Sequence, residues 1–152
     1  MNEHYTFSGG TESFEELALT EREGRTIEKL GITPEDLRKL LAAYPFAEGS
    51  YALLFDLPGH PTTVAKAWKN RRQDFERGTT ENIILRLLKI RRFKNAPEPK
   101  GYLQPSTILF EEKIEGETVK QFDVVQIERL ALALADLHSI ELNAYGKPFT
   151  KR

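Results

Sequence analysis

The chain has 152 residues, of which 39% are hydrophobic and 30% are charged, and its formal net charge at pH 7 is −1. This length suits one domain with a packed core, and this composition excludes a disordered chain. The absence of cysteine excludes disulfides and thiolate metal sites and fits a reducing compartment. Because no apolar run approaches the ~18 residues of a membrane span and the N-terminus has no secretory pattern, we expect a cytoplasmic protein without a membrane partner.

The charges are unevenly distributed along the chain. Between Lys66 and Lys100 there are eleven Lys and Arg residues and only four acidic residues. A basic segment of this kind suits a phosphate group or an acidic partner. A solvated helix face would explain the same cluster, so its place in the fold must decide between the two.

Two helices are expected between residues 13 and 43. The first is rich in charged residues, is broken at Gly24 and closes at Gly31. The second begins after Thr33, which can act as its cap, and Pro34 suits its first position.

A β-hairpin is expected next, because the sequence period changes from about 3.6 to 2. Residues 50–57 and 62–68 are two short strand-like runs, and the segment "PGHP" between them contains two prolines and a glycine. With this alternation, Val64, Lys66 and Trp68 point to one side of the second strand.

The remaining elements alternate between helix and strand. A helix with a wide apolar stripe is expected over 79–93, with one of its two opening threonines as cap. Strands are expected at 100–103 and 107–114, and a final helix over 123–142. This order predicts an α+β fold in which helices pack on a sheet of four or five strands.

Lys66 places an ammonium group among apolar neighbours, where an unpaired charge would cost several kcal/mol or lose its proton. Glu81, in the first turn of the expected helix, is its predicted partner. Glu76 is a rival that we place second, because Gly78 would interrupt a helix begun there. A glutamate from the next helix can hold a strand lysine extended, so that the ammonium binds two phosphate oxygens of a nucleotide. A surface lysine whose stem lies over the sheet is the alternative.

These motifs resemble the N-terminal lobe of the aminoglycoside phosphotransferase and choline kinase-like family, which has a protein-kinase-like fold. The resemblance spans about residues 48–140 and is carried by "EGSYALLFDL", "TTVAKAW", "ENIILRLL", "APEPKGYL", "TILFEEKIEGETV" and "LADLH". It implies an antiparallel sheet of about five strands with a C-helix, preceded by N-terminal helices and followed by the first inter-lobe helix. One departure is that "EGS" contains one glycine where the fuller pattern has two or three.

The resemblance also implies ligands and a binding site. ATP and Mg²⁺ would be bound by the whole enzyme, a small hydroxylated molecule would accept the phosphate, and nucleic acid would not be bound. The nucleotide-binding residues that it implies are Gly49, Ser50, Val64, Lys66, Glu81, Phe110, Glu111, Glu112, Lys113 and Ile114.

The implied division is a helical extension at 1–44, a nucleotide-binding lobe at 45–118, and a helix at 119–152 leading to a C-terminal lobe. No histidine begins a catalytic-loop motif, and no aspartate has an asparagine five positions later. We therefore expect a truncated phosphotransferase that has no catalytic or metal-binding residues in this chain and binds nucleotide weakly at most. Its exposed lobe interface would favour self-association.

Two other functions compete with this interpretation. One is a non-catalytic interaction module derived from a kinase lobe. The other is a DNA-binding helix-turn-helix at 26–44, which is disfavoured because residues 21–44 hold five basic and five acidic side chains. In addition, Glu35 and Asp36 occupy the start of its second helix, where phosphates would approach.

Overall fold

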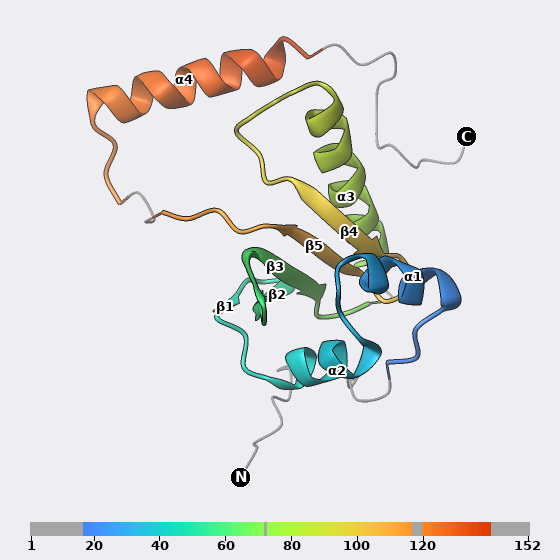
Figure 1. The fold of residues 1–152 in the computed structure, drawn as a ribbon. Coiled ribbons are helices and arrows are strands. Elements are labelled where there is room, and N and C mark those ends of the chain that lie inside the picture. The colour runs from blue at the N-terminus through green and yellow to red at the C-terminus, as the bar shows by residue number, and fades with distance from the viewer. Residues whose placement is uncertain (1–16, 72, 117–119, 141–152) are drawn as a thin grey trace.

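The computed structural model describes residues 17–71, 73–116 and 120–140. In these residues four α-helices and five strands form an α+β fold, and the strands make one antiparallel sheet in the order β1-β2-β3-β5-β4 (Figure 1). The expected α+β class and the antiparallel sheet are confirmed. The strands are β1 Ala47–Glu48, β2 Ala52–Leu57, β3 His60–Trp68, β4 Pro99–Leu103 and β5 Ile108–Glu112. The helices are α1 Glu21–Lys29, α2 Pro34–Ala42, α3 Phe75–Ile90 and α4 Val124–His138. None of the helices in this described part is long and apolar enough to cross a membrane.

The predicted hairpin is formed by β2 and β3. Its turn lies at Pro58 and Gly59, and the φ of Gly59 is +76°, a conformation that a residue with a side chain rarely adopts. Leu54 pairs with Lys66 in the hairpin, and Lys66 pairs on its other side with Leu109 of β5. Lys66 therefore lies on the central strand of the sheet, where both neighbours restrain its backbone.

The first two helices cover one face of the sheet. Ile27 of α1 and Leu37 of α2 are fully buried and pack in one cluster with Phe55, Ala65 and Phe110 of the strands. Burying each large apolar side chain contributes about 1.5–3 kcal/mol, so this cluster holds the described part of the helical extension against the sheet.

Helix α3 covers the opposite face (Figure 1). Leu85 of this helix packs in a second cluster with Ala52, Trp68 and Leu109. The period-2 expectation for β3 is confirmed, because Trp68 belongs to this cluster whereas Ala65 belongs to the other.

Helix α1 differs from the expectation, since it begins at Glu21 and passes through Gly24 without a break. The expected start at residue 13 lies outside the described residues. A capping box between Thr20 and Glu23 fixes the observed start. The second carboxylate oxygen of Glu23 accepts a hydrogen bond from the backbone N–H of Ser106 at 3.2 Å, which ties α1 to the sheet and offsets the weak helix propensity of the glycine.

Helix α2 is formed as predicted. Thr33 caps it, since its side chain accepts from the N–H of Asp36 at 3.0 Å, and Pro34 is its first residue. The hydrogen bond from the Thr33 side chain also lowers the pKa of Asp36. Gly31, with φ +71°, makes the tight turn that joins α1 to α2.

Helix α3 begins earlier than expected, at Phe75, and Gly78 lies inside it, so the expected threonine cap is wrong. A Cβ atom at Gly78 would meet Thr107 Cγ2 at 2.6 Å and the hydroxyl oxygen of Tyr102 at 3.0 Å. The glycine thus permits close packing of α3 on the sheet, and Thr79 uses its hydroxyl at 3.0 Å from that of Tyr102 instead of capping.

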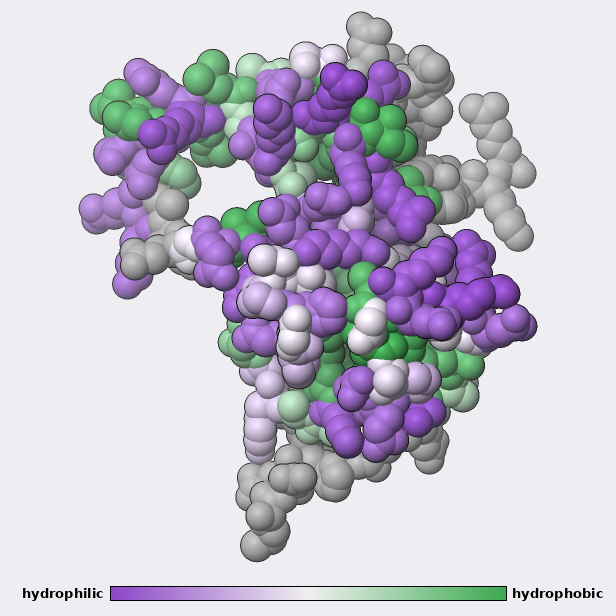
Figure 2. Space-filling view, viewed as in Figure 1, coloured by the Kyte–Doolittle hydropathy of each residue, from purple (hydrophilic) through white to green (hydrophobic). Residues whose placement is uncertain are grey.

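Helix α4 is capped as predicted by Asp123, whose side chain accepts from the N–H of Gln126 at 2.8 Å. The helix ends at His138 with Ser139 as its C-cap, so the predicted end at residue 142 is wrong. None of the residues in α4 is buried, and Val124 and Leu132 are 70% and 71% exposed. Figure 2 shows green, apolar atoms among the purple ones along this helix, at the top of the view.

Candidate functional site

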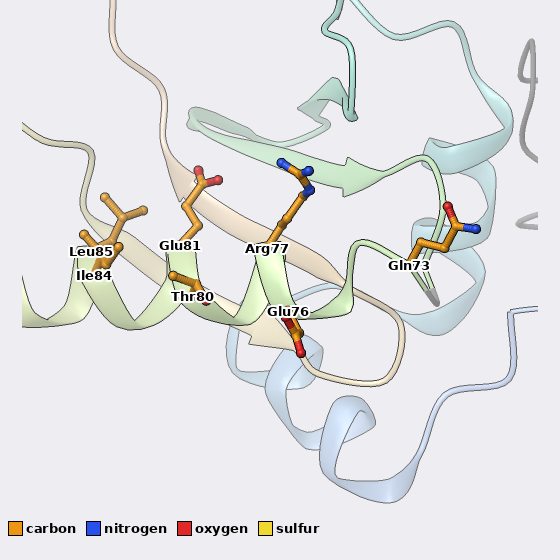
Figure 3. Close-up of a pocket in the computed structure, with 7 residues that line it drawn as sticks. All are labelled: Gln73, Glu76, Arg77, Thr80, Glu81, Ile84 and Leu85. Carbon is orange, nitrogen blue, oxygen red and sulfur yellow. The ribbon is translucent and has the colours of Figure 1, made fainter. Parts of the chain in front are cut away.

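The centre of the site is an ion pair between β3 and α3. Lys66 Nζ donates to Glu81 Oε1 at 2.6 Å, and the two side chains are 24% and 33% exposed. The predicted pairing is confirmed in its geometry. Because α3 begins at Phe75, Glu81 lies in its second turn and not in its first. Figure 3 shows Glu81 extending from a different side of α3 than Glu76, the rival partner.

The Lys66 ammonium has apolar and aromatic neighbours on its own face of the sheet. Its Nζ atom lies 5.1 Å from the ring centroid of Trp68, which is 2% exposed. Val64, two residues earlier on β3, is also buried. Since an aromatic face attracts a cation, the Trp68 ring and the Glu81 carboxylate both attract the ammonium.

Glu111 brings a second carboxylate to this face. Its cross-strand partner is Val64, so both side chains lie on the same side of the sheet as Lys66. Glu111 is 8% exposed, and its Oε2 atom has no hydrogen-bond partner among the described residues. Burial raises the pKa of Glu111 to about 6, the Lys66 charge opposes that rise, and the Glu81 charge adds to it. One ammonium therefore lies near two carboxylates.

Gly49 and Ser50 lie exposed in the turn between β1 and β2. The N–H of Gly49 donates to the carbonyl of Ala52 at 2.8 Å. A Cβ at Gly49 would meet only that carbonyl, at 3.6 Å, and the φ of Gly49 lies outside the left-handed region. The turn itself therefore does not require a glycine at this position.

Arg77 is a candidate site residue that the sequence reasoning missed. Its guanidinium carbon lies 3.9 Å from the ring centroid of Tyr51, the residue after Ser50, and its Nε lies 3.3 Å from Asp74 Oδ1. The spacing of four residues from Glu81 could have indicated this position, because such residues share one side of a helix (Figure 3). Arg77 adds a positive charge beside the β1–β2 turn.

Two of the predicted binding residues do not reach this cluster. Phe110 is 0% exposed and packs in the core on the opposite face, because its pairing with Ala65 directs both side chains there. Ile114 lies beyond the end of β5 and is 64% exposed. The side chains of Phe110 and Ile114 therefore lie outside the cluster around Lys66.

Glu112 and Lys113 have partners elsewhere on the sheet. The Glu112 carboxylate accepts from the backbone N–H of Glu98 at 3.2 Å and so supports the pairing of β4 with β5. Lys113 Nζ donates to Asp56 Oδ1 at 2.7 Å, and this hydrogen bond raises the pKa of Lys113. Of the five predicted residues from 110 to 114, only Glu111 places its side chain beside Lys66.

A hollow of about 650 Å³ runs along the exposed side of α3 and reaches Glu81 (Figure 3). Its lining consists of Gln73, Glu76, Arg77, Thr80, Glu81, Ile84 and Leu85. Within the described residues, no group of three or more His, Asp or Glu side chains is placed to hold a metal ion.

No protein-family model matches the chain, and no curated protein and no solved structure matches it significantly. What the fold and the site define is an α+β domain with a lysine–glutamate pair between its central strand and a covering helix.

Proposed function

We propose that this chain is the nucleotide-binding lobe of a kinase-like, ATP-dependent phosphotransferase that acts on a small hydroxylated molecule. The observation that carries the proposal is the 2.6 Å bond between Lys66 and Glu81, which joins the central strand to the helix after it. The family resemblance of the sequence motifs supports the same interpretation.

The residues present fit a bound nucleotide. An ammonium group has three N–H donors, and Lys66 uses one on Glu81, which leaves donors for phosphate oxygens. Glu81 holds the lysine extended so that the charge is positioned before the ligand arrives. Val64 places an apolar side chain two residues from Lys66 on the same face of the sheet, where the base would pack, and the exposed Ser50 in the β1–β2 turn offers its hydroxyl group to phosphates.

ATP with Mg²⁺ would supply the phosphoryl group that is transferred. Transfer also requires a base for the acceptor hydroxyl and side chains that hold the metal, and we assign neither role to a residue of this lobe. The chain is therefore expected to bind nucleotide without transferring phosphate.

The test is a titration of the 152-residue chain with MgATP, followed by calorimetry and by the fluorescence of Trp68, its single tryptophan. We expect saturable binding that Lys66→Ala weakens about tenfold or more, because a hydrogen bond to a charged group is lost. The matched control is Lys39→Ala, which removes the same charge from an exposed pair with Glu35 on α2 and should leave the affinity unchanged. The proposal fails if the wild type does not bind MgATP or if Lys66→Ala binds it equally well.

A further inference from the structure

Glu111 is buried, and among the described residues no donor reaches one of its two carboxylate oxygens, Oε2. A buried carboxylate without a donor is destabilising, and folded proteins seldom leave one unpaired. Lys66 is the cation that acts on Glu111, yet its ammonium bonds to Glu81. The fold thus keeps one strong acceptor unsatisfied at this place.

The position of this acceptor relative to Lys66 suits the base of a nucleotide. Glu111 is the cross-strand partner of Val64, and Val64 lies two residues from Lys66 along β3, roughly 7 Å at the usual rise per residue. A ligand with phosphates at Lys66 and a base against Val64 would bring an edge of that base to Glu111. An ionised carboxylate only accepts hydrogen bonds, so the edge that it prefers is one that carries an N–H donor.

We propose that Glu111 is a specificity residue, whose carboxylate accepts a hydrogen bond from the exocyclic amino group of the nucleotide base. The site then favours an amino-substituted base such as adenine over the same base without that group. This inference rests on the proposed nucleotide function.

The charges around Glu111 make the preference dependent on pH. Lys66 on β3 and Glu81 on α3 act on it, and Asp56, which accepts from Lys113, lies on the same face, as the cross-strand neighbour of Val64 on β2. The raised pKa of Glu111, about 6, leaves it ionised at pH 8 and largely protonated at pH 5. Because a protonated carboxyl can also donate, discrimination between the two bases should shrink at pH 5.

The experiment compares the binding of ATP with that of purine riboside 5′-triphosphate, which lacks only the amino group, at pH 8. We expect the wild type to bind ATP about tenfold more tightly or better. In Glu111→Met, which keeps the length of the side chain without the acceptor, the ratio should approach one. Glu112→Met alters the neighbouring carboxylate, which accepts from Glu98 and not from the site, and should keep the wild-type ratio.

The outcomes distinguish a failure of the inference about Glu111 from a failure of the proposed function. If ATP binding depends on Lys66 but Glu111→Met keeps the wild-type ratio, the inference about Glu111 is overturned and the proposed function stands. If neither nucleotide binds to the wild type, both fail. Should Glu111→Met not fold, Glu111→Gln replaces it, and the ratio should then fall severalfold because a neutral acceptor bonds more weakly. An unchanged ratio in Glu111→Gln would overturn the inference in the same way.

Discussion

Lys66 Nζ on the central strand lies 2.6 Å from Glu81 Oε1 on α3, and the two residues are 15 positions apart in the chain. Their side chains are 24% and 33% exposed, so water partly screens the pair. Pairs of this kind stabilise a fold by about 1 kcal/mol at most. The pair therefore contributes more by fixing the position of the ammonium than by stabilising the domain.

Replacing Glu81 by Ala should release the ammonium without unfolding the protein. We expect MgATP affinity to fall roughly tenfold, while the free energy of unfolding falls by about 1–3 kcal/mol, because the ammonium loses its hydrogen-bonded carboxylate. Calorimetry and urea unfolding measure the two quantities. Glu76→Ala is the matched control, because it removes the same charge from the first turn of the same helix. Equal MgATP affinities in the two variants would show that Glu81 does not position the lysine.

Glu111 should make the fold less stable as pH rises. Burial raises its pKa from 4.5 to about 6, so the folded state binds the proton more tightly than the unfolded state. The stabilisation of the folded state by this proton is complete below pH 4.5 and is lost as pH rises through 6. The free energy of unfolding that is lost in this way is about 2 kcal/mol. Glu111→Gln does not titrate, so its stability relative to wild type should increase by about that amount between pH 4.5 and pH 8.

Urea unfolding at the two pH values checks this expectation. Glu112→Gln, in which the altered carboxylate is exposed, should show no comparable gain. A Glu111→Gln variant that tracks the wild type at both pH values would mean that the Glu111 carboxyl is solvated in the folded protein.

The elements with strong local signals were predictable from the sequence. Alternation and the turn at Gly59 define the hairpin, while Thr33 and Pro34 define the start of α2. It was also predictable that Lys66 pairs with a carboxylate from the next helix, because a lysine among apolar residues requires an anion. The reason for preferring Glu81 to Glu76 was wrong, however, since α3 includes Glu76 and passes through Gly78.

The starts of α1 and α3 were not predictable, because tertiary contacts decide them. Gly24 and Gly78 have the same poor helix propensity, yet both lie inside helices. At Gly78 the deciding fact is the proximity of Thr107, which no local pattern reveals. Likewise, the unpaired state of Glu111 depends on which residue Lys66 bonds in three dimensions.

The two helical glycines should respond in opposite ways to alanine. At Gly78 an added Cβ would lie 2.6 Å from Thr107 Cγ2, so Gly78→Ala should destabilise the fold. The overpacking costs about 1–3 kcal/mol, which exceeds the gain in helix propensity of about 1 kcal/mol. At Gly24 nothing lies within 4 Å of the added atom, so Gly24→Ala should stabilise the fold by about 0.5–1 kcal/mol. Urea unfolding measures both, and a Gly78→Ala variant as stable as wild type would mean that α3 can move away from the sheet at little cost.

A substitution at Gly49 should change MgATP affinity with little effect on the free energy of unfolding, because the β1–β2 turn does not require a glycine there. An added Cβ would lie 3.6 Å from the Ala52 carbonyl, an ordinary contact, so Gly49→Ala should change the free energy of unfolding by less than about 0.5 kcal/mol. If phosphates approach the backbone of this turn, the methyl group stands in their way, and MgATP affinity should fall severalfold. Gly59→Ala, in the hairpin turn at φ +76°, should do the reverse: it should lose about 1 kcal/mol of stability and keep its MgATP affinity. Unaltered MgATP binding by Gly49→Ala would place the phosphates away from the β1–β2 turn and leave Lys66 as their contact.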